Sequence, residues 1–426
     1  MDGPAKYSMW ANYLDVFDEV GVLARVGSET KECAEEARAD GPGVEFWALP
    51  DYHGPWGYVH KLPKLKKCVR EAVEQSDAYI LRVPGLVGGL VWRELKSRGK
   101  CFALEVVGDP WDALGPGTWP SVFRPAFRRV ATFELKAMCR EASAVHYVTQ
   151  ASLQRRYPAG RNAYVTGFSD ALMDSAFATA ERMEERFQRI DEIAAERQKI
   201  HHTGHRGTTE SVAKSREWRV ARGAERQKTY HRVDGEKAFR IGFIGSFSQM
   251  YKGPDVLLRA VAACRAQGLN VEASLAGEGR CAAAMKALAE ELGIGGEVEF
   301  LGQLPAGEAV FAFLDSIDLF VMPSFAEGLP RALLEAMARG CPCVGSAVGG
   351  IPELLEAAET VPAGEPSALA EKVMEVAGDA GRMKQMASRN LEKSREFSPE
   401  LLTEVRREFC RAVRAQAEGA PGVRGA

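Results

Sequence analysis

The sequence predicts an α/β protein with two Rossmann-like domains that face a cleft. Short apolar runs alternate with helical patterns along most of the chain, the pattern stops near residue 175, and it restarts after residue 238. Strands that alternate with helices of about 10–15 residues are typical of βαβ units and a parallel sheet. The 426 residues are also enough for two or three domains. Ligands of such sheets lie at the carboxyl ends of the strands.

The first domain is expected at residues 1–175. It opens with an aromatic helical pattern where a Rossmann-like domain has a strand and a glycine-rich turn, so we expect its first strand to be missing. Apolar runs predict strands at Phe17–Val26, Val44–Leu49, Ala78–Val83, Cys101–Val107, Ala144–Val148 and Ala163–Thr166. Helical patterns between them predict helices near Leu62–Gln75, Leu86–Ser97 and Val122–Ala142.

The second domain is expected at residues 238–398. Its predicted strands are Phe239–Gly245, Val271–Ala276, Val298–Leu301, Leu319–Met322 and Pro342–Gly345. Its predicted helices are Asp255–Gln267, Cys281–Leu292, Glu308–Ser316, Arg331–Arg339, Ile351–Ala357 and Pro366–Val376. A further helical stretch runs from Arg382 to Gln416, so that residues 399–426 form a last helix and a tail.

Residues 176–237 are expected to be a basic insertion between the two domains. From Arg197 to Arg232 there are ten basic and three acidic residues and few aliphatic ones. Such a segment buries too little apolar surface to order itself, which predicts a surface insertion that is partly disordered or loosely helical. The alternative is an arm that docks on a membrane surface or on an acidic acceptor. Three nearby histidines lack the cysteines or carboxylates that would complete a metal site (His201, His202, His205).

Composition excludes several classes of protein. Apolar residues are 46% and charged residues 27% of the chain, which is typical of a globular protein and not of a disordered or coiled-coil one. The net charge of −3 gives no reason to expect nucleic acid as a partner. No apolar run approaches the length of about 20 residues that crosses a bilayer, and no secretory signal is evident. Nine cysteines without C-x-x-C spacing indicate reduced thiols and a cytoplasmic protein.

The most informative segment is residues 321–335, with the sequence VMPSFAEGLPRALLE. A strand ends at Met322, a loop follows, and Pro330 stands where a helix begins, a position that suits its fixed φ. The free N–H groups and partial positive charge of a helix N-terminus make it a ready site for a diphosphate at the end of a strand. Gly328 allows the backbone to come close to such a ligand.

Two carboxylates bracket this turn, Glu327 and Glu335, with seven residues between them. Glu327 lies on the loop, where a sugar beyond the phosphates would be. Glu335 lies inside the helix, where it could accept hydrogen bonds from ribose hydroxyls. On spacing alone, Glu335 is equally explained as a surface partner of Arg331 and Arg339, each four residues away.

These motifs occur in an order that resembles the retaining GT-B glycosyltransferases of family 4. The resemblance runs from Phe239 to about Glu396. It includes the segment from Gly245 to Lys252-Gly253, the L-A-G-E-G run at 275–279, the F-L-G run at 300–302, Glu-x7-Glu, and the A-M-A-R-G-C-P and G-G-I-P-E runs that follow. In this family the last helix crosses back to the first domain, and we expect residues 399–416 to do so here.

The resemblance implies a role for each residue of the predicted donor site. Glu327 would contact the donor hexose and assist the transition state, Lys252 would neutralise the diphosphate, and Glu335 would bind the ribose. The remaining donor-binding candidates are backbone and loop positions around them: Gly245, Ser246, Gly302, Gln303, Ser324, Gly328, Leu329 and Pro330. Among these, Gly328, Leu329 and Pro330 would hold sugar hydroxyls and phosphate, and Gly302 with Gln303 would meet the base.

Two positions depart from the family pattern. Ser246 stands where many relatives have an arginine, so one phosphate-binding cation is absent or comes from elsewhere. Asp109 stands where many relatives have a histidine that faces the donor sugar, and it is our third candidate for a catalytic residue. The alternative for Asp109 is a turn-forming aspartate before Pro110.

The activity implied is transfer of a hexose from a nucleotide-diphosphate sugar to an acceptor hydroxyl, with retention at the anomeric carbon. No D-x-D pair is present, so we expect no metal and no other cofactor. The acceptor is not indicated, and the expected location is the cytoplasm, including peripheral contact with the inner face of the membrane. Two alternatives stay open: another GT-B enzyme such as an epimerase, and a degenerate protein that binds a nucleotide sugar without turnover.

Overall fold

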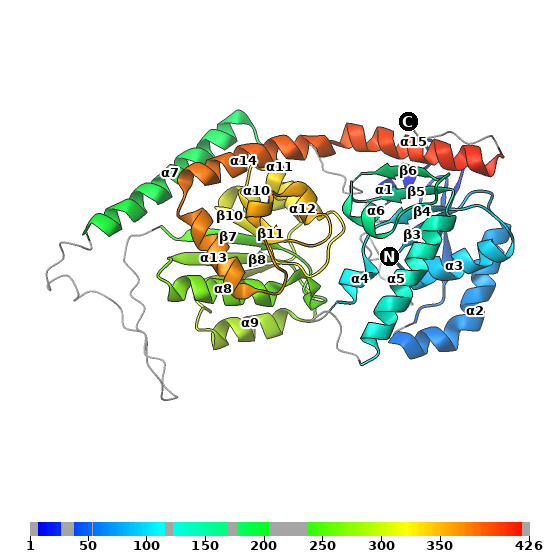
Figure 1. The fold of residues 1–426 in the computed structure, drawn as a ribbon, viewed down its shortest axis with the longest axis horizontal. Coiled ribbons are helices and arrows are strands. Elements are labelled where there is room, and N and C mark those ends of the chain that lie inside the picture. The colour runs from blue at the N-terminus through cyan, green and yellow to red at the C-terminus, as the bar shows by residue number, and fades with distance from the viewer. Residues whose placement is uncertain are drawn as a thin grey trace. The chain divides into compact units, whose positions relative to one another are not determined.

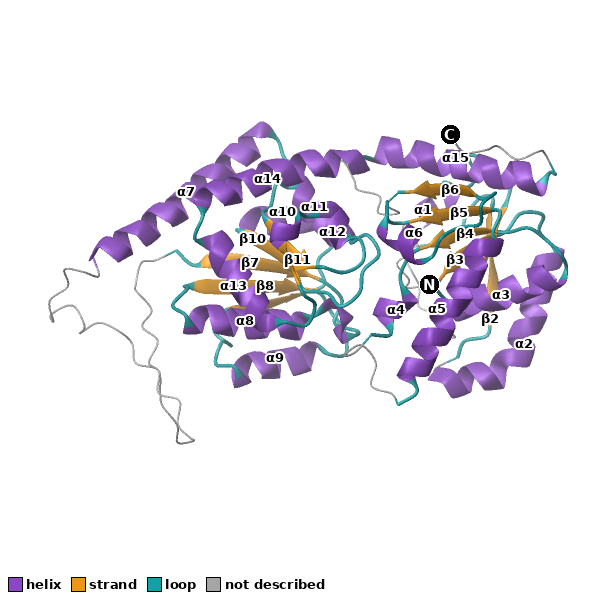
Figure 2. Ribbon diagram, in the orientation of Figure 1, coloured by secondary structure: helices purple, strands orange, loops and turns teal. Residues whose placement is uncertain are grey.

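A computed structural model describes residues 7–26, 38–52, 54–115, 122–168, 177–203 and 237–419. The chain divides into two compact units (Figures 1 and 2). Unit 1 comprises residues 1–114, 121–172 and 399–426, and unit 2 comprises residues 115–120 and 173–398. The predicted α/β class is confirmed, because each unit is built on parallel sheet with helices packed on it.

Unit 2 contains one sheet of six parallel strands in the order β12-β11-β10-β7-β8-β9. The sequence order of these strands therefore differs from their order in space, and β7 and β10 become neighbours. The strands are β7 (Phe239–Ile244), β8 (Val271–Ala276), β9 (Val298–Gly302), β10 (Leu319–Met322), β11 (Cys343–Ser346) and β12 (Thr360–Val361). The short β12 is absent from the sequence prediction because two residues carry no periodicity.

The helices of unit 2 enclose this sheet (Figure 1). Helix α8 packs against α9 and α13, while α11 packs against α14 and α14 against α7. Their bounds are α7 (Ala180–Thr203), α8 (Pro254–Ala266), α9 (Ala282–Glu291), α10 (Glu308–Ser316), α11 (Arg331–Ala338), α12 (Ile351–Leu354), α13 (Pro366–Ala377) and α14 (Ala380–Ser394). The described part of unit 2 also has three 3₁₀ turns, at Met250–Lys252 (η3), Ala357–Glu359 (η4) and Arg395–Phe397 (η5).

Helix α7 corrects the expected boundary of the insertion at residue 176. Its Ile190 and Ile193 are buried in the core of unit 2, and the buried Arg186 donates to the carbonyl oxygens of Leu314 and Ile317 at 3.0 and 2.9 Å. The prediction rested on the excess of basic residues in 197–232. It therefore overlooked the apolar residues of α7, which recur at the spacing of one helix face. Residues 204–236 lie outside the described residues, so the predicted disorder and docking role of the rest of the insertion stay predictions.

Unit 1 holds two parallel sheets. Strands β1 (Val20–Arg25) and β2 (Val44–Leu49) pair with each other alone, and a second sheet has the order β3-β4-β5-β6, as far as the described residues show. The bounds of these four strands are β3 (Ile80–Val83), β4 (Ala103–Val106), β5 (Ala144–Tyr147) and β6 (Tyr164–Gly167). The predicted strands agree with these within about three residues, and the described part of the chain has a helix, α1 (Tyr7–Ala11), ahead of β1.

The helices of unit 1 are α2 (Gly54–Glu74), α3 (Leu86–Ser97), α4 (Pro110–Ala113), α5 (Arg124–Glu141), α6 (Ser152–Arg156) and α15 (Pro399–Ala417). Helix α2 begins eight residues earlier than its periodicity predicts, because Pro63 interrupts the pattern and is nevertheless accommodated inside the helix. The last helix, α15, belongs to unit 1, where its Phe409, Cys410 and Val413 pack with Tyr13, Ala103 and Ala144.

A row of buried polar groups crosses the sheet of unit 1 beneath α15. Glu105 accepts hydrogen bonds from the Tyr13 hydroxyl and from Arg82, the latter at 3.0 Å. Next to Glu105 in the register, the buried His146 stacks on Phe168 with ring centroids 3.8 Å apart. Neither ring nitrogen of His146 has a hydrogen-bond partner among the described residues. Burial, with the positive charges of Arg406 and Arg82, lowers the pKa of His146 to about 3.

Two findings concern membrane-spanning helices and disulfide bonds. Among the described residues, no helix is both long and apolar enough to cross a membrane. The eight cysteines within the described ranges are all free thiols, and four of the five buried ones lie in unit 2 or under α15 (Cys264, Cys341, Cys343, Cys410).

Candidate functional site

The candidate site is the carboxyl edge of the six-stranded sheet of unit 2. Loops after β7, β8 and β9 are fastened to one another there by backbone hydrogen bonds. Gly245 donates to the carbonyl of Ala276 at 3.0 Å, and Gly277 donates to that of Gly302 at 2.7 Å. Gly277 has φ +146°, and a Cβ at this position would lie 1.9 Å from the carbonyl oxygen of Gly245. Only glycine fits such an approach, so this edge presents closely packed backbone.

A salt bridge joins two adjacent strands at this edge. The Nζ of Lys252, after β7, lies 2.8 and 3.0 Å from the two carboxylate oxygens of Glu327, after β10. The fully buried Ser324 donates its hydroxyl to Oε1 of Glu327 at 2.6 Å. Because β7 and β10 are neighbours in the sheet, residues 75 positions apart in the sequence meet here.

Local backbone contacts hold both members of this pair. Lys252 ends the turn η3, and Gly253 follows it with φ +69°. A Cβ on Gly253 would lie 2.1 Å from the carbonyl oxygen of Pro323. Phe325 also donates its N–H to the carbonyl of Tyr251 at 2.7 Å. The turn that carries Lys252 is therefore attached directly to the loop that carries Glu327.

The surroundings of Lys252 favour its charged form. Burial opposes the charge on Lys252, but attraction by Glu327 and the contact with Tyr251 outweigh it, so the pKa of Lys252 is raised. The ammonium lies 5.1 Å from the centroid of the Tyr251 ring, within the range of a cation–π contact. The side chains of Lys252 and Glu327 are 18% and 6% exposed, so the pair is only weakly screened by solvent.

The loop from Glu327 to Pro330 is closed from the other side by two glycines. Gly350 donates its N–H to the carbonyl of Gly328 at 2.7 Å. Gly349 has φ +54°, and a Cβ there would lie 2.0 Å from the carbonyl oxygen of Glu327. Helix α11 begins at Arg331 directly after this loop, with Pro330 at its N-cap. The N-terminus of α11 and its partial positive charge thus lie beside the Lys252–Glu327 pair.

The other predicted donor-binding residues lie at the same edge in different environments. Ser246 is exposed, and its hydroxyl accepts a hydrogen bond from the N–H of Ser248 at 3.1 Å. Gln303 is exposed after β9, whereas Leu329 is buried. Glu335 is half-buried and accepts a hydrogen bond at 2.8 Å from Arg331, the surface partner that its spacing also predicts.

Asp109 belongs to unit 1, whereas the other candidates belong to unit 2. It caps α4 by accepting from the N–H of Trp111 at 2.8 Å, as expected of an aspartate before Pro110. Its two oxygens also accept hydrogen bonds from the Tyr157 hydroxyl and from Arg156. Both carboxylate oxygens of this buried side chain are thus bonded within unit 1. The predicted contact of Asp109 with a donor sugar stays a prediction.

Sequence reasoning missed two residues at the carboxyl edge of unit 2. Tyr251 lies against the ammonium of Lys252. Arg280 follows the glycine-rich run after β8 and donates to the carbonyl of Ser248 at 2.8 Å, which places a cation beside the loop that carries Ser246. An arginine directly after L-A-G-E-G was the signal that could have identified it.

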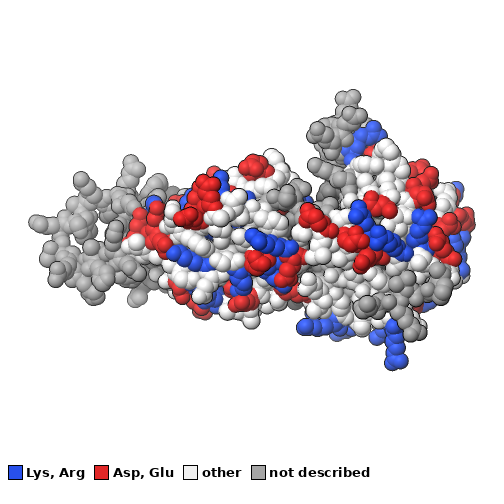
Figure 3. All heavy atoms as spheres, turned by 90° about the horizontal axis from the view of Figure 1, so that it is seen from above, with Lys and Arg blue, Asp and Glu red and all other residues white. Residues whose placement is uncertain are grey.

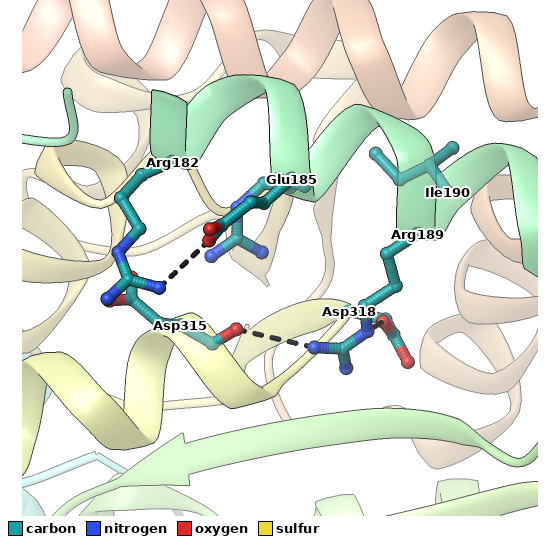
Figure 4. A pocket seen from close by; sticks show the side chains of 7 residues that line it. Arg182, Glu185, Arg189, Ile190, Asp315 and Asp318 are labelled. Atoms are coloured by element: carbon teal, nitrogen blue, oxygen red, sulfur yellow. Dashed lines mark hydrogen bonds and ion pairs between the residues drawn. The ribbon is translucent and has the colours of Figure 1, made fainter. Parts of the chain in front are cut away.

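A pocket in unit 2 lies elsewhere (Figure 4). It is formed where α7 meets α10 and the amino end of β10, so it is at the opposite edge of the sheet from Lys252 and Glu327. Arg182 points to Glu185 and Arg189 lies against Asp318, at 2.8 and 2.7 Å. The pair of Arg189 with Asp318 attaches α7 to the unit, whereas the pair of Arg182 with Glu185 lies within α7.

Comparisons with known proteins give relatives of this chain in sequence and in fold. Residues 238–379 match the family model described as glycosyl transferases group 1. Protein CapJ of Staphylococcus aureus is 24% identical over 347 residues, which cover 81% of this chain and 73% of CapJ. A D-inositol 3-phosphate glycosyltransferase of Corynebacterium glutamicum is 31% identical over 167 residues, 37% of this chain and 40% of that protein. The chain thus spans less than half of the latter relative.

Solved structures show the fold. Sucrose-phosphate synthase from Thermosynechococcus elongatus has a TM-score of 0.64 at 16% identity and covers 93% of this chain and 90% of its own. Anabaena HepE in complex with UDP and glucose has a TM-score of 0.58 at 19% identity and covers 96% of both chains. Glycosyltransferase activity is supported by the domain match together with this fold. The chain thus has the GT-B fold, and its residues 238–379 match the family model of the group 1 glycosyl transferases.

Proposed function

We propose that this protein is a retaining hexosyltransferase that moves a hexose from a nucleotide-diphosphate sugar to an acceptor hydroxyl. The observation that carries the proposal is the Lys252–Glu327 salt bridge, fixed by Ser324 beside the N-terminus of α11. UDP sugars are the first donors to test, since HepE has been solved with UDP and glucose.

The pair has the polarity that departure of a nucleoside diphosphate requires. Negative charge grows on the leaving β-phosphate, and positive character grows on the anomeric carbon of the hexose. In our proposal Lys252 and the first N–H groups of α11 stabilise the phosphate, and Glu327 stabilises the anomeric carbon. Because both groups are held in place before the donor arrives, little reorganisation is needed during the reaction.

The remaining roles follow from position along the same edge. Glu335 would bind ribose hydroxyls, Gly302 and Gln303 would face the base, and Arg280 would supply the second phosphate-binding cation that Ser246 does not. Charge neutralisation by these groups requires no metal in this proposal. The carboxyl-edge glycines, such as Gly277, let backbone N–H groups approach the diphosphate.

Transfer assays with Glu327→Gln test the proposal. The amide keeps the size of the side chain but removes its charge, so we expect transfer from the preferred donor to fall at least about 100-fold. Glu371→Gln, on the exposed face of α13, is the matched control and should leave transfer unchanged. The anomeric configuration of the product, measured by NMR, tests retention.

Three results would contradict the proposal. Undiminished transfer by Glu327→Gln removes the assigned role of Glu327. Consumption of the donor without an acceptor, with formation of an isomeric sugar, indicates an epimerase. If calorimetry shows that a nucleotide sugar binds, but the sugar is not consumed with any acceptor, the protein binds nucleotide sugars without turnover.

A further inference from the structure

We propose that unit 1 docks on the surface of an anionic lipid bilayer through the first residues of α2 and α5. The two segments are residues 54–70 and 122–133, and we call them together the docking surface. They contain five and three Lys or Arg residues, respectively, and no Asp or Glu. In a chain with a net charge of −3, this is a marked local excess of positive charge.

The docking surface also exposes large apolar side chains. On α2, Trp56 is 86% exposed and Val59 is 56% exposed. At the start of α5, Phe123, Phe127 and Val130 are spaced by four and three residues, so they lie along one side of the helix. These three and two neighbours are between 45% and 87% exposed (Val122, Phe123, Phe127, Val130, Phe133). Contiguous exposed apolar groups of this size mark interaction sites.

The two segments lie close together within unit 1. Helix α3 connects the two helices, since Arg98 pairs with Glu74 of α2 at 2.9 Å and Arg93 pairs with Glu134 of α5 at 2.7 Å. Tyr58, beside Trp56, lies close enough to Arg93 and Glu134 to interact with their charges.

Acidic partners begin at the far end of the α2 segment, where Lys67 pairs with Glu71 and Arg70 lies 4.0 Å from Glu94. On and after α3 the basic residues are likewise paired, as in the pairs of Lys96 with Glu141 and Arg98 with Glu94. Acidic and basic side chains are also mixed around α14 in unit 2 and, separately, around α15 in unit 1 (Figure 3). An excess of positive charge interleaved with aromatic and aliphatic groups therefore distinguishes the docking surface from these other parts of the described surface.

A bilayer fits these features better than another macromolecule does. Lys and Arg near an anionic membrane each contribute attraction, and Trp and Phe partition into the region of the headgroups. A second copy bound through the same face would place eight positive charges against eight, which is unfavourable. Duplex nucleic acid would satisfy the charges, but its stacked bases would gain little from Trp56, Phe123 and Phe133, which are all more than half exposed.

Co-sedimentation of the full chain with vesicles tests this inference. The vesicles are pure phosphatidylcholine or phosphatidylcholine with about one third phosphatidylglycerol, and we expect binding only to the latter, with a decrease as salt is raised. Trp56→Ser/Phe123→Ser/Phe133→Ser should lower the partition coefficient about tenfold or more. Lys64→Gln/Lys66→Gln/Arg129→Gln should lower it to a similar extent, since each cation contributes separately.

The matched control is Val165→Ser/Leu401→Ser, which removes two exposed apolar groups of unit 1 outside the docking surface. This control should bind vesicles as the unchanged protein does, and all variants should retain transfer to a water-soluble acceptor. Absence of binding to anionic vesicles, or equal loss in the control, overturns the inference. The protein could instead bind heparin or DNA tightly, without a preference for vesicles, and the serine variant could retain this binding in full. That result overturns the inference in favour of an acidic polymer.

Discussion

Each unit has a carboxylate in a loop that follows a strand of a parallel sheet, but the partners of the two carboxylates differ. In unit 2, Glu327 pairs with a lysine from the neighbouring strand and lies beside a helix N-terminus. In unit 1, Asp109 caps the short helix α4 and bonds to Arg156 and Tyr157. Parallel strands thus end in an ion pair beside a helix N-terminus in unit 2. In unit 1 they end in a carboxylate whose oxygens both accept hydrogen bonds from residues of the same unit.

The difference arises in the backbone. Glycines at Gly253, Gly277 and Gly349 let the loops of unit 2 approach one another more closely than any Cβ permits. Unit 1 instead divides its strands between two sheets and fills the space under α15 with aromatic and buried polar side chains. Four substitutions test this difference between the two units. They are given in decreasing order of the effect that we expect.

Gly253→Ala should have the largest effect. A Cβ at 2.1 Å from the carbonyl oxygen of Pro323 forces apart the two loops that carry Lys252 and Glu327. We expect unit 2 to lose about 4 kcal/mol or more of unfolding free energy, together with binding of the donor. Gly293→Ala is the matched control, since its φ of +70° is almost the same and its Cβ meets nothing within 4 Å. It should cost about 1 kcal/mol and leave donor binding intact.

Lys252→Met comes next. It leaves the carboxylate of Glu327 buried without its partner, so we expect a loss of about 3 kcal/mol in urea unfolding. Adding Glu327→Gln should restore part of this stability, because the unpaired charge is then removed. A double variant whose loss equals the sum of the two single losses would show that the pair is not coupled, and would remove the main electrostatic difference between the two edges.

Asp109→Asn should have a smaller effect, confined to unit 1. The amide keeps an oxygen for the cap but weakens the bond with Arg156, so we expect a loss of about 1–2 kcal/mol in thermal unfolding. Asp112→Asn is the control, since Asp112 also pairs with Arg156, at 3.0 Å, but does not cap the helix. If Asp109→Asn alone slowed transfer by more than about 1.4 kcal/mol of activation free energy, a tenfold effect, with little change in stability, the predicted contact with the donor sugar would be supported instead.

At neutral pH, His146 should give the smallest effect of the four, because its contribution to the dependence of stability on pH begins only as the pH falls below about 6.5. The folded protein keeps His146 neutral down to a pKa of about 3, whereas the unfolded chain protonates it near its ordinary pKa of 6.5. The unfolded state therefore binds the extra proton below pH 6.5, and stability should fall by about 1.4 kcal/mol per pH unit as the pH is lowered. His146→Phe should remove this component of the slope, and an unchanged slope in that variant would contradict the assignment.

Much of the fold and the location of the site could be predicted from the residues alone. Most of the predicted strands and helices agree with the structure within a few residues, because side-chain periodicity reports local backbone conformation. The motifs from Gly245 to Glu335 all lie at one sheet edge, since parallel strands end together. Helix α7 was assigned to an insertion because its apolar stripe is narrow and was averaged with the basic residues beyond it.

The sequence by itself determined the α/β class, the order of the elements and the identities of Lys252 and Glu327 as candidates. The tertiary structure was needed to show that these two side chains bond, that Asp109 bonds to Arg156 and Tyr157, and that Trp56 and Phe123 are exposed near one another in unit 1. The physical reason is that periodicity depends on near neighbours, whereas partners depend on strand order. Strand β10 lies beside β7 across 75 residues of chain, and no local pattern records that contact.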